Sequence, residues 1–337
     1  GPKVEVSGFF GSQTTSNELD LLNASEYAVV KNNAFANGGM PQPFETTNLG
    51  EGTNWQNEVF QSAPIQSYNI SVSGGSEKTT YSIGGSYFGQ QGIVGGEKAN
   101  FERYNGRVNI STAISDHIQF NSVLLYTNEE RSTLPENGIG SVLYNTINAY
   151  PTESVRQADG SYSYLELVND IINPLAQMEN TFNQANTNKF VGKEEIVADL
   201  GEHFEWTNRF SFNYAAVEGK TFSPLVWYGP GKAPNTALNE NLDPSLVEIA
   251  DSTFLERGAS VSENRDSYID LTFESFLNYG RTFNDVHSVK GTFGVSSFSR
   301  RGEGLNATAF NIPNNSEEFA DISANQAAQG FLNNAGS

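Results

Sequence analysis

Apolar and polar side chains alternate along several stretches of the chain, most clearly at 204–216. Successive side chains of a β-strand point to opposite faces of the sheet, so strict alternation predicts a strand whose faces meet different surroundings. One face of this strand carries Glu, Thr, Arg, Ser and Asn. The other face is almost entirely aromatic and consists of Phe204, Trp206, Phe210, Phe212 and Tyr214.

The same alternation recurs along the chain and predicts about nine strands. Each predicted strand has about 8–13 residues, whereas strands of globular proteins usually have about 5–6. A strand that crosses a bilayer needs about 9–11 tilted residues. The other predicted strands cover 3–11, 68–74, 81–88, 104–111, 118–126, 191–200, 267–280 and 287–298.

The connections between these strands alternate in length. Short turns rich in Gly, Asp, Asn or Ser are typical of tight hairpins and lie at 74–78, 115–117, 201–203 and 284–287. The other connections are long, at 12–66, 128–189 and 216–266, with a shorter one near 89–101. In an up-and-down sheet, all short turns then lie at one end and all long loops at the other, as in outer-membrane barrels.

We therefore predict an all-β fold, a transmembrane antiparallel β-barrel with long extracellular loops and short periplasmic turns. A soluble β-sandwich or propeller also alternates and also contains many glycines. Its connections would be of mixed length, with no separation of short turns from long loops, so the alternation of lengths favours the barrel.

Composition excludes several other classes of protein. The chain has 337 residues, no cysteine, and 19 basic against 39 acidic side chains, a net charge of −20. Without thiols the chain has no disulfide framework and no cysteine-ligated metal. The acidic balance argues against nucleic-acid binding. No stretch approaches the roughly 18–20 apolar residues of a spanning helix.

The long connections contain local helical patterns. Residues 19–28 predict a short amphipathic helix, and 54–60 predict a helical turn that ends before Pro64. Residues 138–150 predict a further helical turn.

Blocks of sequence in the first 125 residues carry recognisable motifs. They read DLLNASEY at 20–27, TNWQNEVF at 53–60, APIQSYNISVSGGSEKT at 63–79, YSIGGSYF at 81–88 and FERYN at 101–105. In content and order these blocks resemble the SusC/RagA family of TonB-dependent transporters of Bacteroidetes. The remainder of the chain agrees with that family in pattern rather than in motif.

The resemblance implies a barrel of about 22 strands with a plug domain inside it. It also implies an N-terminal TonB box, a SusD-like surface lipoprotein as lid, and location in the cell outer membrane. On this view residues 1–337 are the N-terminal portion of the barrel, about nine strands. We expect the signal peptide, the TonB box and the plug domain to lie outside this portion.

The function implied by the resemblance is import of glycans or oligopeptides across the outer membrane, not enzymatic catalysis. The implied partners are the SusD-like lipoprotein, outer-membrane lipid, the substrate, and the TonB–ExbB–ExbD complex, which would act through the missing N-terminal region. No nucleic acid is expected. Two other functions remain open: a passive structural or adhesion barrel, and a soluble secreted β-protein that binds glycans.

No group of residues in the sequence points to catalysis, a cofactor or a metal. His117, His203 and His287 all fall in or beside predicted short turns, without the paired spacing of a metal site. Paired acids such as Glu129-Glu130 are common in loops and on lumen faces, and glycoside hydrolysis needs two carboxyls that face a bound sugar.

Aromatic residues of the long loops are the candidates for substrate contact, because aromatic faces stack on sugars and pack on peptides. The candidates are Trp227, Tyr228, Tyr144, Tyr150, Tyr162 and Tyr164. Trp227-Tyr228 is the strongest of these, because the Gly-Pro-Gly that follows would present the rings on a rigid turn. Each ring has an ordinary alternative role in loop packing or in the aromatic girdle of a barrel.

The alternation also assigns the two faces of the predicted barrel wall. The aromatic face of 204–216 (Phe204, Trp206, Phe210, Phe212 and Tyr214) should face lipid. Arg209, Asn213, Glu274 and Lys290 should face the lumen or the plug.

We predict that Phe210→Arg destabilises the barrel by about 2–4 kcal/mol, because it places a charge near the middle of the lipid face. Arg209→Ala on the lumen face should cost far less. A refolding titration of both variants measures the two losses, and equal losses would contradict the assignment of the faces.

Overall fold

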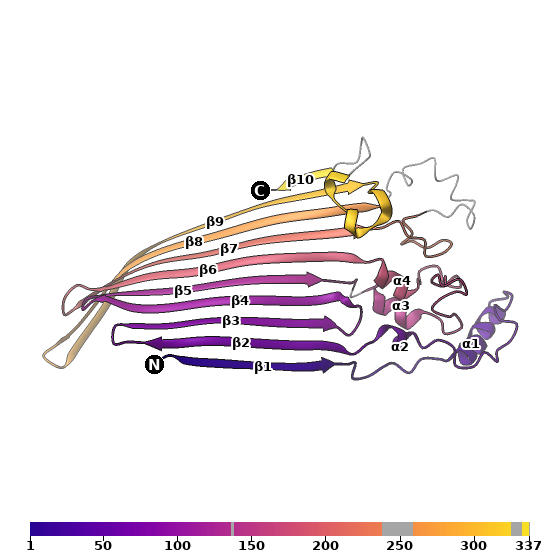
Figure 1. Cartoon of the computed structure of the whole chain (residues 1–337), viewed down its shortest axis with the longest axis horizontal. Coiled ribbons are helices and arrows are strands. Elements are labelled where there is room, and N and C mark those ends of the chain that lie inside the picture. Colours follow the sequence, from indigo (N-terminus) through magenta and orange to yellow (C-terminus); the bar gives the residue numbers. More distant parts are fainter. Residues whose placement is uncertain (136–137, 238–258, 325–331, 337) are drawn as a thin grey trace.

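The computed structural model describes residues 1–135, 138–237, 259–324 and 332–336. Ten strands form one antiparallel sheet, in which each strand pairs with the next one along the chain (Figure 1). The strands are β1 (Lys3–Gln13), β2 (Ala63–Gly75), β3 (Thr79–Gly92), β4 (Gly96–Ser115), β5 (Ile118–Ser132), β6 (Phe182–Asp199), β7 (Phe204–Ser223), β8 (Ser260–Phe283), β9 (His287–Phe310) and β10 (Leu332–Gly336).

The nine predicted strands are all present, which confirms the all-β prediction, and a short tenth strand follows them. The strands are longer than alternation predicted: β4 and β7 each have 20 residues, and β8 and β9 each have 24. Alternation underestimates their length because apolar side chains recur along only part of each strand. Toward the outer loops both faces become polar, as in the outer parts of β8 and β9.

The four predicted short turns and the three long loops lie at opposite ends of the sheet (Figure 1). The turns at 76–78, 116–117, 200–203 and 284–286 are at one end. At the other end are the first outer loop (14–62), the second (133–181) and the third (224–259, described to 237). These loops contain α1 (Ala24–Asn37), α2 (Trp55–Val59), α3 (Val142–Asn148) and α4 (Pro174–Glu179). Three 3-10 helices follow β9: η1 (Pro313–Asn315), η2 (Glu317–Phe319) and η3 (Ile322–Ala324).

The loop predicted near 89–101 is wrong in extent, because β3 and β4 continue through most of it and leave only 93–95 as a turn. Gly95 and Gly96 have φ angles of +86° and +52°, which side chains other than glycine rarely adopt. Two consecutive left-handed residues turn the chain sharply, so a run that looked like a loop forms a tight hairpin.

The sheet has one apolar face and one polar face. Directly paired residues share a face, and the apolar face contains pairs such as Phe210 with Phe273 and Val72 with Ile83. Phe204, Trp206, Phe210 and Tyr214 lie on it with 41–42% of their surface exposed, and Phe212 lies among them half-buried. Their contact with lipid remains a prediction, but the sheet itself leaves these rings uncovered.

An aromatic row crosses the apolar face on the side nearer the outer loops. On β2 to β4 it consists of Tyr68, Tyr87 and Tyr104, which pair in register, with ring centroids 6.3 and 4.9 Å apart. On β5 to β7 it continues with Tyr126, Phe190 and Tyr214, also in register. We call these six residues the outer aromatic row. Barrels carry such girdles where the apolar band meets the interface, so the row indicates the outer border of the membrane.

The polar face holds charged groups in a lateral network. The guanidinium of Arg209 lies between two carboxylates, with N–O distances of 2.7 Å to Glu195 and 3.0 Å to Glu274. Glu195 also accepts a hydrogen bond of 3.1 Å from Asn121. Asn213, Glu274 and Lys290 share this face, as predicted for the lumen side.

This network changes the control for the Phe210→Arg comparison. Removing Arg209 leaves two neighbouring carboxylates without their shared counter-charge, so Arg209→Ala will cost more than alternation alone suggested. Ser211→Arg, on the same strand and on the polar face, is the better matched variant.

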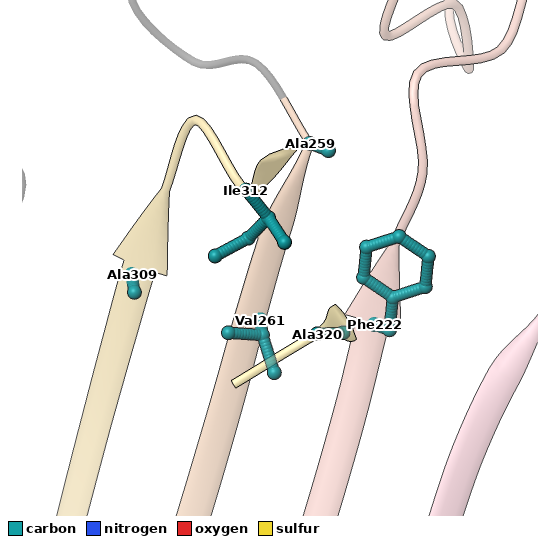
Figure 2. Packing of buried hydrophobic residues seen from close by; sticks show 6 residues of the cluster. All are labelled: Phe222, Ala259, Val261, Ala309, Ile312 and Ala320. Atoms are coloured by element: carbon teal, nitrogen blue, oxygen red, sulfur yellow. The ribbon is translucent and has the colours of Figure 1, made fainter. Parts of the chain in front are cut away.

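The buried hydrophobic clusters of the described residues lie at the outer end of the sheet. One of them joins the ends of β7, β8 and β9 to the segment that follows β9 (Figure 2). Phe222, Val261 and Ala309 come from the strands, while Ile312 and Ala320 come from that segment. The rest of the sheet has no packed layer of this chain against it in the described part.

Among the described residues, no helix is long and apolar enough to cross a membrane. Within the same residues the sheet is open, because β1 pairs only with β2 and β10 pairs only with β9.

Candidate outer-loop site

The first and second outer loops pack directly against each other. Asn54 caps α2 by accepting hydrogen bonds from the amides of Gln56 and Asn57. The residue before this cap, Thr53, lies against the second loop. The backbone N–H of Thr53 donates to the carbonyl of Pro151 at 2.9 Å. The indole N–H of Trp55 donates to the carbonyl of Tyr150 at 3.0 Å. Two loops about 100 residues apart in sequence therefore form one body.

A hollow of about 550 Å³ lies between these two loops. Its wall includes Tyr144, whose hydroxyl donates to Asp170 at 3.0 Å. Other apolar and charged side chains of both loops also contribute to it. The lining includes Leu21, Leu22, Ile147, Val168 and Ile171, together with Asp20, Lys31 and Glu51.

Two of the predicted contact residues are buried inside the loops. Tyr150 is 2% exposed, stacks on Tyr27 with ring centroids 5.9 Å apart, and accepts a hydrogen bond from the amide of Leu167. Tyr228 is 9% exposed and packs with Ile172, and burial raises its pKa to about 12. The turn after Trp227-Tyr228 does not present both rings as predicted, because Tyr228 points into the cluster. In this structure both tyrosines hold loops together.

The remaining predicted aromatics are partly accessible. Tyr162 donates to Glu179, and the guanidinium of Arg156 lies 3.9 Å from the centre of its ring. Burial and then Glu179 raise the pKa of Tyr162 to about 12. Tyr164 lines a second hollow of about 480 Å³ that also borders Phe44. Trp227 is half-buried, and its indole N–H lies buried without a partner among the described residues.

Lys232 is a buried lysine that the sequence did not reveal. Its side chain is 4% exposed, and its ammonium group donates to the backbone carbonyls of Leu165 and Val168. Burial lowers its pKa to about 8, against the opposing charges of Asp170 and Glu166. This lysine joins the third outer loop to the second. No local signal identifies it, because a lysine in a polar loop is ordinarily exposed.

The negative charge of the chain is concentrated in the outer segments. Residues 14–62, 133–181, 224–259 and 311–331 hold 20 acidic and 4 basic side chains, a net charge of −16 out of −20. The rest of the chain holds 19 acidic and 15 basic side chains and is almost neutral. Whatever approaches the outer loops meets a strongly negative field.

The described residues contain no group of three or more His, Asp or Glu arranged to hold a metal ion. His117, His203 and His287 lie at or beside three separate turns of the short-turn end. The hollow between the first two loops is lined by aromatic, aliphatic, amide and carboxylate side chains.

No family model matches the chain. Among curated proteins it is 28% identical over 222 residues to "TonB-dependent receptor SusC" of Bacteroides thetaiotaomicron, covering 60% of this chain and 21% of that protein. It is 24% identical over 335 residues to "TonB-dependent receptor P26" of Formosa agariphila, covering 98% of this chain and 31% of that protein. The chain thus spans less than a third of the length of these relatives.

Solved structures show the same fold. The chain superposes on the RagAB peptide importer in its closed-closed state with a TM-score of 0.73 and 14% identity, covering 99% of this chain and 39% of that one. The open-open state gives the same TM-score at 13% identity, with 100% and 38% covered.

The contact between the first two outer loops gives a matched pair of glycine variants. Gly52 and Gly50 have φ angles of +71° and +72°, so alanine adds a similar strain of about 1 kcal/mol at either position. A Cβ at Gly52 would lie 2.1 Å from the carbonyl oxygen of Pro151, whereas a Cβ at Gly50 meets nothing within 4 Å. We predict that Gly52→Ala separates the loops and that Gly50→Ala does not.

Limited proteolysis of the full-length protein measures this separation. New cleavage within 14–62 is expected in the Gly52 variant alone. The same cleavage in both variants would mean that backbone strain, rather than the close approach to Pro151, explains the effect.

The lowered pKa of Lys232 predicts a pH dependence of the contact between the second and third loops. The packed lysine loses its proton near pH 8, whereas an exposed lysine keeps it to about pH 10.5. Between these values the unpacked state binds more protons, so the packed state becomes more stable as the pH rises. Resistance of the two loops to an alkaline-active protease should increase from pH 8 to 10.5.

Lys232→Met removes the titrating amine and should abolish this increase. Lys78→Met, in an exposed turn at the other end of the sheet, serves as the control and should retain it. An identical pH profile for all three proteins would contradict the role of Lys232.

Proposed function

Because this chain belongs to the SusC/RagA family of TonB-dependent receptors, we propose that it forms part of the barrel of an importer of glycans or oligopeptides. The chain is a segment of an outer-membrane transport protein, not of an enzyme. The superposition on the RagAB importer confirms the predicted fold, and the matches to TonB-dependent receptors agree with the predicted family and location. The substrate class, the energy coupling and the remaining partners are proposals.

Residues 1–337 are, in this proposal, the N-terminal portion of a barrel of about 22 strands. The open sheet supports the need for further strands, because an unpaired edge in lipid leaves backbone groups without partners at several kcal/mol each. The match to only 38–39% of the RagAB importer chains agrees with a partial wall. The plug, the TonB box and the signal peptide would belong to other parts of the full protein.

We infer that a SusD-like surface lipoprotein covers the outer loops. The solved relative is the RagAB complex, described as a peptide importer. In this chain the three outer loops pack into one body through Trp55, Lys232 and their carbonyl partners, which provides a firm surface for a lid. Opening would be driven by the TonB–ExbB–ExbD complex acting on the plug.

The charge of the outer loops narrows the substrate class. A net charge of −16 on the outer segments repels polyanions such as sulfated or uronate-rich glycans. Neutral oligosaccharides and neutral or basic oligopeptides are therefore favoured. Tyr144, Tyr162, Tyr164 and Trp227 remain the proposed contacts, whereas Tyr150 and Tyr228 are too buried to reach a ligand without rearrangement of the loops.

Uptake by cells tests the proposal. Uptake of labelled neutral oligosaccharides, basic oligopeptides and a uronate oligosaccharide is measured in a strain that lacks the full-length gene and in the same strain complemented with that gene. Each measurement is made with and without TonB. We expect uptake of one neutral or basic class, dependent on both the gene and TonB, and none of the uronate.

Each alternative function gives a different result. Gene-dependent uptake that persists without TonB would indicate a passive barrel. Release of the protein from membranes by a carbonate wash would indicate a soluble glycan-binding protein. Preferential uptake of the uronate would contradict the argument from charge.

A further inference from the structure

A third hollow lies on the outward face of the wall, above the outer aromatic row. It has a volume of about 430 Å³ and is lined by Glu130, Asn186, Glu218, Lys220, Glu263 and Arg265, among others. The strand register places these residues on the same face as the aromatic row. Glu130, Asn186, Glu218 and Arg265 pair across β5 to β8, while Tyr126, Phe190 and Tyr214 pair four residues lower.

This position corresponds to the headgroup layer of the outer leaflet. Four residues of a strand advance about 13 Å along it. The aromatic row marks the interface, and the strands continue beyond it as a polar wall. A molecule that occupies this hollow therefore approaches from the membrane side. A transported substrate would instead pass along the polar face, on the other side of the sheet.

Amide side chains connect the aromatic row to the hollow. The hydroxyl of Tyr126 donates to Asn188 at 2.7 Å. Asn128 donates to Asn188 at 3.1 Å and to Asn186 at 3.2 Å. Amides both donate and accept hydrogen bonds, so this ladder suits the hydroxyl and amide groups of a sugar.

The segment after β9 contacts the strands that line the hollow, closer to their outer ends. Figure 2 shows Ala320 of this segment beside Phe222 and Val261, at the outer ends of β7 and β8. Gln184 of β6 donates to Glu317 of the same segment at 3.2 Å. The hollow thus lies between a hydrophobic cluster above it and the aromatic row below it.

Two cationic side chains, Lys220 and Arg265, line the hollow, and both also act electrostatically on the carboxylate of Asp321 beyond it. Arg265 has 68% of its side chain exposed, and its guanidinium approaches Glu263 only to 3.6 Å. Lys220 pairs directly with Glu263 in the strand register and lies two residues from Glu218. Lysine and arginine together hold phosphate oxygens well, whereas the neighbouring carboxylates accept hydrogen bonds from hydroxyls.

We propose that this hollow binds the phosphorylated sugar headgroup of an outer-leaflet lipopolysaccharide. Lys220 and Arg265 hold the phosphate, and the asparagine ladder with Glu130 and Glu218 holds the sugar. The acyl chains then run down the apolar face past the tyrosines of the aromatic row. This inference rests on the outer-membrane location of the wall and not on the identity of the transported substrate.

Binding of fluorescent lipopolysaccharide to the full-length receptor in phosphatidylcholine nanodiscs tests the proposal. The double variant Lys220→Ala/Arg265→Ala should bind about tenfold more weakly, the effect of losing charge-assisted hydrogen bonds. Lys189→Ala, on the polar face of β6 beside Asn188, is the matched control and should bind like the wild type. Both substituted residues of the double variant lie outside the buried clusters, and resistance to heat unfolding on gels verifies that each variant is folded.

Competition experiments identify the chemistry of the ligand. Dephosphorylated lipopolysaccharide should bind the wild type as weakly as intact lipopolysaccharide binds the double variant. Inorganic phosphate and phosphatidylglycerol should not displace the labelled lipid.

Three outcomes would overturn the proposal. They are equal affinity of the wild type and the double variant, displacement by inorganic phosphate, which would indicate a free-phosphate site, and equal competition by phosphatidylglycerol, which would indicate a general anionic-lipid surface. Uptake of substrate is a separate measurement, so failure here leaves the transport proposal to its own test.

Discussion

Every backbone N–H and C=O group of a wall in hydrocarbon must find its hydrogen-bond partner within the protein. The strands β2 to β8 meet this constraint by pairing with both sequence neighbours along most of their length, whereas the described sheet stays open beyond β1 and along most of β9. In such a hydrogen-bonded sheet, successive side chains of each strand point to opposite faces, so the wall has two faces of different composition. One face is apolar up to the outer aromatic row, and the other carries networks such as that of Arg209.

Buried hydrophobic clusters like those of soluble proteins lie at the outer end of the molecule, among the loops. There the chain must bury its own apolar side chains, and clusters form around Trp55 and Tyr150, around Ile172 and Tyr228, and around Phe222 and Val261. Between the aromatic row and the short turns, the described sheet has no such cluster, as expected of a barrel wall that faces lipid on one side and the lumen on the other. The wall and the outer loops therefore differ in composition. The wall has an uncovered apolar face, whereas the loops bury their apolar side chains in clusters.

The net charge also differs between the wall and the outer segments. The wall and short turns are nearly neutral, whereas the outer segments carry most of the net charge of −20. Within these segments, Lys232 is buried against carbonyls rather than paired on the surface. The loops therefore combine a negative outer field with a packed interior.

The sequence by itself determined the nine longer strands, the separation of turns from loops, and the two faces of the wall, because these depend on a period of two that is local in the chain. It also identified the family through the motifs of the first 125 residues. The sequence could not show that Tyr150 and Tyr228 are packing residues, that 93–95 is a tight turn, or that Lys232 joins two loops. Those features depend on contacts between distant segments, such as Trp55 with Tyr150 and Lys232 with Leu165, and only the tertiary structure decides which distant groups meet.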